Sequence, residues 1–336
     1  MAASIWMKNS IEAHLADLGG SGQQAGGDGR FPVWDASISS MWAIGNFARL
    51  EDFFKVSARL GFAKIEMNYQ VNSSMLAGIE LTNYQFSSLH DPCPAELSPE
   101  ELKGRDWLTS AVNDDCRQEG VAVVKRSIDL AHELGAPVVV IHAGNIGVSS
   151  TLEKELQNLY EAGRTQSQEY VDIKDRLIEL RVSRAEPRLA AVEKSLRELV
   201  DYASRYEICL GLENRYHYLD IPSLEEMGSL LRLADADQLG FVYDAGHAHT
   251  LDQLGFTPHK EWFTRYASRI VGTHLHDAIG IEDHAAPGLG EIDFGMVAAH
   301  LPDGAFRTCE LRRSNTIEQV KAGIQYLVDK GCVKCR

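Results

Sequence analysis

Residue types that bind metal ions recur in this sequence where β-strands are expected to end. Apolar segments typical of buried strands lead directly into six of them: His90, His142, Glu213, Asp244, His274 and Glu310. The last four are separated by 31, 30 and 36 residues, about one strand plus one helix each. Strands that alternate with helices predict a parallel sheet, and eight strands predict a closed (β/α)8 TIM barrel. All strands of that fold end at one mouth, so these side chains should converge.

The eight expected strands are separated by segments with helical periodicity. We expect strands at residues 33–39, 62–67, 85–90, 137–142, 207–213, 239–244, 270–276 and 305–311. Helices are expected at residues 46–60, 113–134, 222–233, 261–268 and 316–330. The helix at 113–134 has a clear C-terminal stop, because Gly135 can adopt the left-handed conformation that ends helices.

One connection is about twice as long as the others. His142 and Glu213 are 71 residues apart, and the excess, residues 149–184, is charged and has helical periodicity. We expect a helical insertion after strand four, at the mouth of the barrel. It could be a solvated excursion, a lid or a contact in a homo-oligomer, and the sequence leaves these alternatives open. Residues 1–30 contain a Gly-rich stretch and are expected to be a flexible N-terminal extension of a single barrel domain, residues 31–336.

Composition limits the cellular setting and the partners. The chain has 336 residues and no run of about 18 apolar residues, so no membrane span is expected. Its N-terminus lacks the basic and apolar regions of a secretory signal, and its six cysteines are scattered, so a cytoplasmic location is expected. A net charge of −15 argues against a broad nucleic-acid surface, although a metal cluster can supply local positive charge.

The convergent set of imidazoles and carboxylates predicts a metal site. Several carboxylates at one mouth would repel one another unless cations held them together. The mixture of nitrogen and oxygen ligands suits Zn²⁺, Mn²⁺, Co²⁺ or Fe²⁺.

Several short motifs resemble one known superfamily. They are Ile-His-Ala-Gly at 141–144, Leu-Glu-Asn at 212–214, Tyr-Asp-Ala-Gly-His at 243–247, His-Leu-His-Asp at 274–277 and the strand-end Glu310. Together they resemble the xylose isomerase-like barrels, which include sugar isomerases and epimerases, inosose dehydratases and endonuclease IV. The resemblance covers about residues 33–330.

Resemblance to the epimerases implies one divalent metal and a small sugar or sugar phosphate as substrate. The implied metal ligands are Glu213, Asp244, His274 and Glu310. The metal would polarise a carbonyl of the sugar and stabilise an enediolate, and Glu213 and Glu310 would act as general base and acid. The candidate substrate-binding residues are His90, His142, His247, Arg215 and His284. This activity is our main prediction.

Resemblance to endonuclease IV implies a different chemistry on the same scaffold. Its three-metal site would add His90, His142, His247, Glu282 and His284 to the four ligands above, with Glu282 in place of an Asp. The alternative prediction is therefore a multinuclear metal phosphodiesterase. Against it, residues 91–94 are Asp-Pro-Cys-Pro, unlike the DNA-intruding loop of the endonuclease. A dehydratase acting on a keto-cyclitol or keto-acid is a further alternative, close to the epimerases in chemistry.

Overall fold

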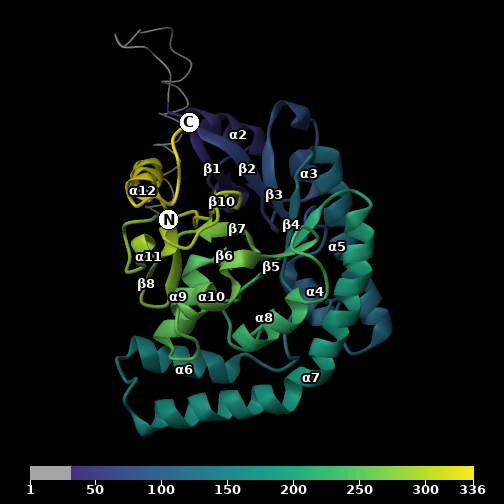
Figure 1. Ribbon diagram of the computed structural model, residues 1–336, viewed down its shortest axis with the longest axis vertical. Coiled ribbons are helices and arrows are strands. Elements are labelled where there is room, and N and C mark those ends of the chain that lie inside the picture. Colours follow the sequence, from purple (N-terminus) through teal and green to yellow (C-terminus); the bar gives the residue numbers. More distant parts are fainter. Residues whose placement is uncertain (1–31) are drawn as a thin grey trace.

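Eight parallel strands pair edge to edge around a closed barrel, in the order β1-β10-β7-β6-β5-β4-β3-β2 (Figure 1). The computed structural model describes residues 32–336, so the expected extension of residues 1–30 lies outside the described residues. The barrel strands are β1 (Trp34–Ser39), β2 (Phe62–Met67), β3 (Phe86–His90), β4 (Val138–Ile141), β5 (Cys209–Glu213), β6 (Leu239–Asp244), β7 (Ile270–Leu275) and β10 (Phe306–Cys309). Every one lies within the range predicted for it, and the predicted (β/α)8 fold is confirmed.

Helices surround the barrel, and a two-stranded hairpin extends from its mouth after β7 (Figure 1). The hairpin consists of β8 (Asp277–Ile279) and β9 (Glu282–Ala285). The α-helices are α2 (Leu50–Arg59), α3 (Ser73–Leu76), α4 (Pro99–Arg105), α5 (Asp114–Leu134), α6 (Thr151–Glu161), α7 (Gln168–Ser204), α8 (Leu224–Leu231), α9 (Ala245–Gln253), α10 (Glu261–Tyr266), α11 (Phe294–Ala298) and α12 (Ile317–Asp329). Three short 3-10 helices complete the described chain: η1 (Ser40–Ala43), η2 (Leu81–Asn83) and η3 (Ala267–Arg269).

Local side-chain hydrogen bonds decide where several helices begin. The helix expected at 46–60 starts only at Leu50, because the Asn46 amide donates to the carbonyls of Trp42 and Arg313 and holds this segment in a turn. In α5, the Asn113 side chain accepts from the backbone N–H of Cys116 at 3.0 Å, and Gly135 ends the helix with a φ of 65°.

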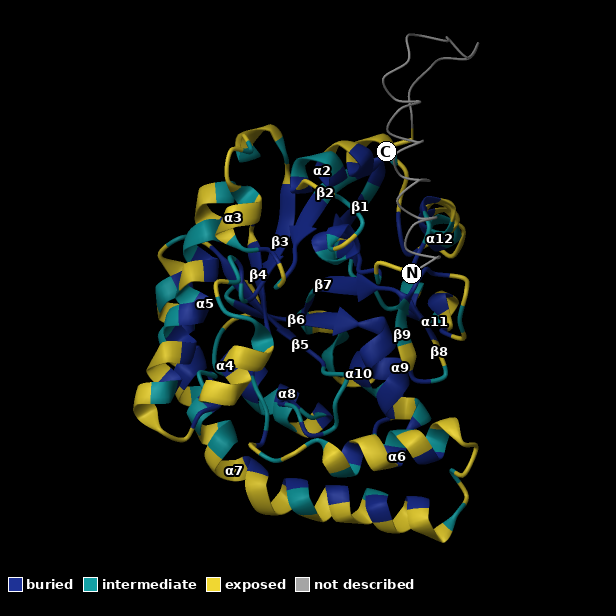
Figure 2. Ribbon diagram, turned by 180° about the vertical axis from the view of Figure 1, so that it is seen from behind, coloured by how far each residue is buried: buried dark blue, intermediate teal, exposed yellow. Residues whose placement is uncertain are grey.

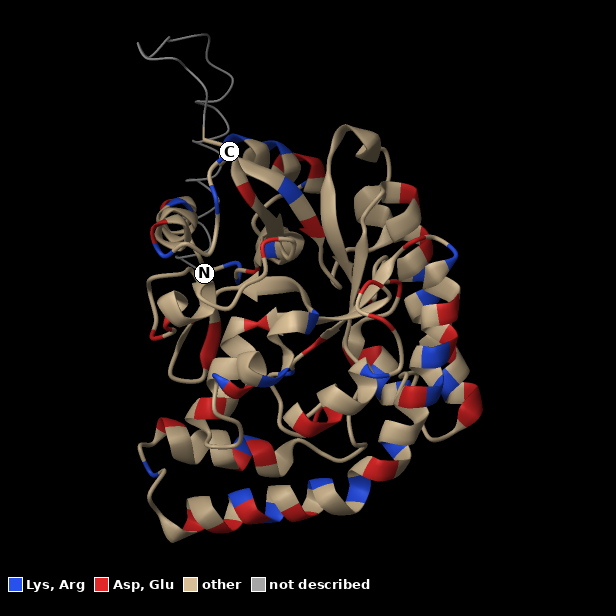
Figure 3. Cartoon of the chain, viewed as in Figure 1, with Lys and Arg blue, Asp and Glu red and all other residues tan. Residues whose placement is uncertain are grey.

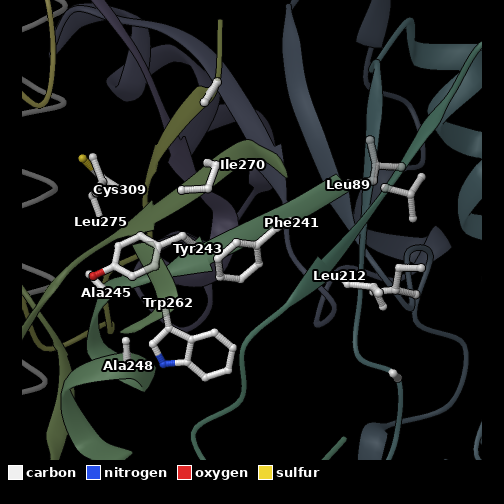
Figure 4. Close-up of a cluster of buried hydrophobic side chains, with 14 of the residues drawn as sticks. Leu89, Leu212, Phe241, Tyr243, Ala245, Ala248, Trp262, Ile270, Leu275 and Cys309 are labelled. Carbon is white, nitrogen blue, oxygen red and sulfur yellow. The ribbon is translucent and has the colours of Figure 1, made fainter. Parts of the chain in front are cut away.

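The apolar core lies between the strands and the helices around them. On its β6 side the rings of Phe241 and Trp262 stack with their centroids 5.8 Å apart (Figure 4). The ring of Tyr243 packs on Phe263, with the two centroids 4.4 Å apart. Figure 2 shows that the strands are buried, whereas the outer faces of α6 and α7 are exposed. The strands are therefore covered on their outer side by helices, as a parallel barrel requires.

The inside of the barrel, in contrast, carries a chain of polar side chains. The hydroxyls of Ser37 and Thr308 lie 2.7 Å apart, and Ser87 donates to Ser37 at 2.9 Å. Ser88 donates to the buried carboxylate of Glu66 at 2.7 Å. Because each of these side chains has at least one hydrogen-bond partner, burial inside the barrel is tolerated, and the chain leads towards the mouth.

The long connection after β4 forms two helices, α6 and α7, which pack against each other at the edge of the molecule (Figure 1). Helix α7 has 37 residues and continues past the predicted end of the insertion to pack against α5. The inserted segment and the helix that precedes β5 are therefore one continuous helix. Acidic and basic residues alternate along it (Figure 3). Within residues 32–336, no helix is long and apolar enough to cross a membrane.

Candidate metal centre

Four ligand-type side chains from four strands meet at the mouth of the barrel. This quartet consists of Glu213 at the end of β5, Asp244 at the end of β6, His274 in β7 and Glu310 directly after β10. His274 Nδ1 lies 2.5 Å from Glu213 Oε1, 3.1 Å from Glu310 Oε2 and 3.6 Å from Asp244 Oδ2. One donor atom of each member lies within 4.8 Å of the others. Ligands lie about 2.0–2.2 Å from Zn²⁺ in a tetrahedral arrangement, so neighbouring donors are about 3.3–3.6 Å apart, which is within this limit.

The carboxylates of the quartet are buried and need positive charge. Glu213 and Asp244 are 0% exposed and Glu310 is 2% exposed. Burial alone would raise the pKa of each carboxyl, but His274 and neighbouring imidazoles hold the pKa values of Glu213 and Glu310 well below their usual range. Burial would likewise lower the pKa of His274, but Glu310, Glu66 and Glu213 raise it well above its usual value. A divalent cation would supply the same compensation more strongly than one imidazolium, so the donor set fits such an ion.

Glu66 of β2 fixes the orientation of the His274 ring. Its Oε2 lies 2.9 Å from His274 Nε2, and its Oε1 has no hydrogen-bond partner among the described residues. With the proton on Nε2, His274 donates to Glu66 and directs its Nδ1 lone pair at the carboxylates of the quartet. A carboxylate behind a histidine ligand is a common support of metal sites. Sequence analysis missed Glu66, although it stands near the end of a predicted strand, where the other candidates were found.

His90 and His142 flank the quartet on the Glu213 side. His142 Nε2 lies 2.8 Å and His90 Nε2 lies 3.8 Å from Glu213 Oε2. His90 Nδ1 is 3.1 Å from the carbonyl oxygen of Asp91, which can only accept, so Nδ1 carries a proton and Nε2 faces Glu213. Burial lowers the pKa of His142 well below its usual value, whereas Glu213 outweighs burial and raises the pKa of His90. His90, His142 and Glu213 form the His90 cluster, whose donor spacing also fits a metal ion.

A second flanking set, the His247 cluster, consists of His247, Asp283 and His284. His247 Nδ1 lies 2.9 Å from the carbonyl oxygen of Asn214, so its Nε2 is free to face Asp283, at 3.8 Å. His284 Nδ1 lies 2.8 Å from Asp283 Oδ1, and its Nε2 lies 3.6 Å from Glu310 Oε2. The cluster is thus joined to the quartet through Glu310.

Glu282, which the sequence placed among the additional metal ligands, is not brought to either cluster. Its side chain is 68% exposed and pairs with Arg312. The backbone of His284 has a φ of 58°, an uncommon conformation for a residue other than glycine. Successive side chains of a strand point to opposite faces, so Asp283 faces the pocket while Glu282 faces solvent.

His276 is a buried residue of the predicted His-Leu-His-Asp motif that received no role from the sequence. Its Nδ1 accepts from the backbone N–H of His284 at 2.9 Å, so Nε2 carries the proton and donates to both oxygens of Asp244, at 2.9 and 3.0 Å. His276 therefore orients Asp244 instead of offering a lone pair of its own. Gly246 makes room for this ring, because a Cβ at Gly246 would lie 2.1 Å from His276 Cε1.

Arg215 extends from the loop after β5 into the same pocket. Its Nη1 lies 2.6 Å from Glu213 Oε2 and its Nε lies 3.5 Å from Asp220 Oδ2. The guanidinium therefore partly balances the carboxylates and stands where it could contact a bound substrate.

The inserted helices hold this loop in place. Glu153 of α6 accepts from the backbone N–H of Tyr218 at 2.7 Å. Arg181 of α7 donates to the carbonyls of Tyr218 and Asp220, the latter at 2.9 Å, and pairs with Glu226 of α8. Both Glu153 and Arg181 are buried, so α6 and α7 support the loop that carries Arg215.

A pocket of about 230 Å³ contains the parts of the centre that a substrate could reach. All five residues predicted to bind substrate line it: His90, His142, His247, Arg215 and His284. Glu213 and Glu310 of the quartet, together with Tyr69, Tyr216 and His217, also line it. Sequence analysis missed Tyr69, which follows β2 and has no distinguishing neighbours in the sequence.

Comparison with known proteins finds one protein family whose model matches most of the chain. A family model described as xylose isomerase-like TIM barrel matches residues 55–330. The protein y4fM of Sinorhizobium fredii is 26% identical over 219 residues, which are 65% of this chain and 57% of that protein. MJ1311 of Methanocaldococcus jannaschii is 25% identical over 223 residues, 65% of this chain and 64% of that protein. The match thus spans less than two thirds of either relative.

Solved structures of low sequence identity share the fold. A D-tagatose 3-epimerase-like protein superposes with a TM-score of 0.60 at 20% identity, covering 88% of this chain and 96% of that one. The 3-keto-D-glucoside 4-epimerase YcjR of E. coli gives 0.56 at 15% identity, covering 84% and 95%. The IolI protein with a bound zinc atom gives 0.54 at 14% identity, covering 88% and 95%.

Proposed function

Because the chain belongs to the xylose isomerase-like TIM barrel family, we propose that it is a metal-dependent sugar isomerase or epimerase. The quartet carries the proposal: its three buried carboxylates and one imidazole offer donors within 4.8 Å of one another. Solved structures that share the fold include epimerases of D-tagatose type and of a keto-glucoside, and a zinc-binding protein, which supports a sugar substrate and a divalent metal. Mn²⁺, Co²⁺, Zn²⁺ and Fe²⁺ all suit the donor set.

All four residues of the quartet would hold the metal ion, and two of them, Glu213 and Glu310, would also transfer protons. A divalent ion held by the quartet would polarise the carbonyl of a sugar and acidify the adjacent C–H. Glu213 and Glu310 both line the pocket, and a carboxylate beside a metal-bound carbonyl could take up a proton from carbon as a general base. In an isomerisation one carboxylate returns the proton to the neighbouring carbon. In an epimerisation the two carboxylates act on opposite faces of the sugar. His247 and Arg215 lie where they can bind the substrate oxygens.

The experiment that tests this proposal follows carbon-bound hydrogen. Metal-loaded full-length protein is incubated in D₂O with a panel of ketoses and keto-sugars, and deuterium uptake next to the carbonyl is measured by NMR. We expect uptake with at least one substrate, and we expect Glu310→Gln to abolish it while the melting temperature is retained. Gln keeps the size of Glu310 and an oxygen donor but cannot carry the proton. Full exchange by Glu310→Gln would refute the acid–base assignment.

A multinuclear metal phosphodiesterase is the second candidate, because a specific observation favours it. The His90 cluster and the His247 cluster adjoin the quartet. In the first, Nε2 of His90 faces the carboxylate of Glu213, and in the second, Nε2 of His247 faces the carboxylate of Asp283. Such a site would clamp a phosphate between metal ions. Metal analysis separates the candidates: about one ion per chain favours the isomerase, and about two or three favour the phosphodiesterase. Cleavage of abasic-site duplex DNA that is lost in His90→Ala would install the second candidate. A dehydratase would share the first proton removal and then expel a hydroxyl group.

A further inference from the structure

A second, larger cavity of about 580 Å³ lies beside the metal centre. It shares Tyr69, His142 and Arg215 with the central pocket, so the two spaces adjoin. The central pocket, at about 230 Å³, is smaller than the roughly 300–1,000 Å³ typical of sites for drug-sized ligands, and suits a single sugar ring. The adjoining cavity therefore has room for a second chemical group on the same substrate.

The far wall of this cavity carries a group of apolar side chains among polar ones. It is built from α4, the loop that follows it and α5. Its apolar side chains include Leu102, Trp107, Leu108, Val123 and Val124, and its polar residues are Ser98, Glu100 and Thr109. Trp107 is partly exposed, and Arg105 lies 4.9 Å from its ring centroid without lining the cavity. Aromatic and aliphatic walls of this kind bind apolar and planar groups.

Charge in the cavity disfavours a phosphate. Among the described residues that line it, Arg215 is the single Lys or Arg, and it is already paired with Glu213 at 2.6 Å. The carboxylates of Asp91 and Glu100 also line the cavity, and Asp91 accepts from Ser127 at 2.7 Å. A phosphate placed here would face two carboxylates with no unpaired cation beside it.

A third space beside the mouth has the reverse charge. It has a volume of about 360 Å³, shares Tyr69 with both other cavities, and is lined by Arg312 and Arg313. Arg312 is paired with Glu282, and Arg313 is exposed. A sugar phosphate would therefore place its phosphate beside Arg313 and not in the cavity beside Trp107. The two spaces thus favour different substituents.

We propose that the substrate is a keto-glycoside, with its sugar ring at the quartet and an apolar aglycone in the cavity beside Trp107. This inference rests on the proposed isomerase or epimerase function. An aglycone closes the anomeric carbon as an acetal, so the carbonyl needed for proton removal must lie on another carbon of the ring. The base removes the proton from the carbon beside this ketone, and the C–H electrons form the enediolate. Return of a proton to the opposite face gives the epimer, with no oxidant or reductant consumed.

The test compares two keto-glycosides that differ only in the aglycone. Deuterium exchange by metal-loaded full-length protein is measured with methyl and phenyl 3-keto-β-D-glucopyranoside. We expect kcat/KM to be at least about tenfold higher for the phenyl compound. This ratio corresponds to roughly 1.4 kcal/mol of additional binding free energy from the apolar contact. Ala95→Trp, which fills the cavity from a residue outside the metal centre, should remove this preference and leave the methyl compound unaffected. Arg313→Ala, in the third space, is the matched control and should change neither rate.

Other outcomes overturn the inference in distinguishable ways. Equal kcat/KM for the two glycosides, or a phenyl preference that survives Ala95→Trp, refutes the aglycone cavity and leaves the proposed function standing. Faster exchange with D-fructose 6-phosphate that is lost in Arg313→Ala also refutes it and installs a sugar phosphate. Exchange with none of these compounds and with no member of the panel of ketoses and keto-sugars refutes the proposed function itself. In that case fluorescence titration with 4-nitrophenyl β-D-glucopyranoside still tests whether the cavity binds an aglycone. Binding should quench the fluorescence of Trp107. An identical signal in Trp107→Phe would overturn the assignment.

Discussion

Glu66 decides which nitrogen of His274 can meet a metal ion. Both side chains are 0% exposed, and the 2.9 Å contact between them holds the imidazole in one orientation. Without Glu66, either ring nitrogen could carry the proton, and the Nδ1 lone pair would face the quartet for only part of the time. The carboxylate also adds negative charge behind the ring, which makes the imidazole a stronger ligand.

We therefore predict that Glu66→Gln lowers the affinity for Mn²⁺ or Zn²⁺ by about 10- to 100-fold, the usual cost of losing such a support. Gln keeps the volume of Glu66 and a hydrogen-bonding group but removes its charge. Isothermal titration calorimetry of metal-stripped protein measures the effect, and Glu96→Gln, at an exposed position, is the matched control. An unchanged dissociation constant would show that Glu66 serves only the packing of the barrel interior.

His259 gives the molecule a measurable pH dependence of stability. It is buried beside the hydroxyl of Tyr243, and burial, together with His249, lowers the pKa of His259 to about 4. In the unfolded chain the pKa is near 6.5, so between pH 6.5 and 4 the unfolded chain binds more protons and stability is lost as the pH falls.

From these pKa values we predict that His259 accounts for a loss of about 2 kcal/mol in the free energy of unfolding between pH 7 and pH 5. His259→Gln, which cannot titrate, should lack this part of the loss. Urea unfolding of both proteins at the two pH values measures the difference. The same loss in both proteins would mean that His259 is solvated enough to accept its proton in the folded state.

At the scale of elements, the hairpin β8–β9 marks the limit of what motifs could predict. The strand-end positions of Glu213, Asp244, His274 and Glu310 could be predicted, because each follows an apolar strand at a regular interval. The choice between Glu282 and Asp283 could not, because these neighbours point to opposite faces of β9, and the sequence does not show which face of the hairpin turns towards the pocket. The site roles of all these residues remain predictions, whereas their convergence is a fact of the fold.

The helices α6 and α7 have a structural consequence for the pocket. Buried hydrogen bonds of Glu153 and Arg181 with the backbone fix the loop that carries Arg215. The insertion therefore stabilises one wall of the pocket. The sequence could indicate that the insertion is helical, but not which loop it would contact, because that depends on the bend of the chain between α6 and α7.

We predict that Arg181→Met lowers the free energy of unfolding by about 3 kcal/mol, because it leaves Glu226 and two backbone carbonyls without their buried cation. Metal affinity should remain unchanged, since the quartet is attached to the strands. Urea unfolding and metal titration measure the two quantities, and Arg176→Met, at an exposed position of the same helix, is the control. A large fall in metal affinity would indicate that the insertion shapes the quartet itself.

At the scale of the whole molecule, the barrel closes within the described residues. β1 begins at Trp34 and pairs with both β2 and β10, so all eight strands have two neighbours. The order of the strands follows from the alternation of strands and helices in the sequence. The cavity beside Trp107, in contrast, could not be predicted. Residues 91–113 have no regular hydrophobic period, and the fold alone brings them together with α5 and the mouth of the barrel.

We predict that a protein lacking residues 1–30 keeps the melting temperature of the full chain, because all eight barrel strands and the strands with which they pair lie beyond residue 30. Differential scanning calorimetry of the two proteins tests this. A drop of several degrees, equivalent to about 1 kcal/mol or more, would show that the extension packs on the barrel.

The four members of the quartet come from four strands of one closed barrel, and Glu213 and Glu310 lie far apart along the chain. An ion bound among them would act as a non-covalent crosslink, so a chelator should lower the melting temperature and the right metal should restore it. A metal at 100 times its dissociation constant stabilises the folded state by about 2.7 kcal/mol. Heat unfolding in the presence of Mn²⁺, Co²⁺, Zn²⁺ or Fe²⁺ would then rank the ions by affinity. This ranking would indicate the preferred metal before any substrate is known.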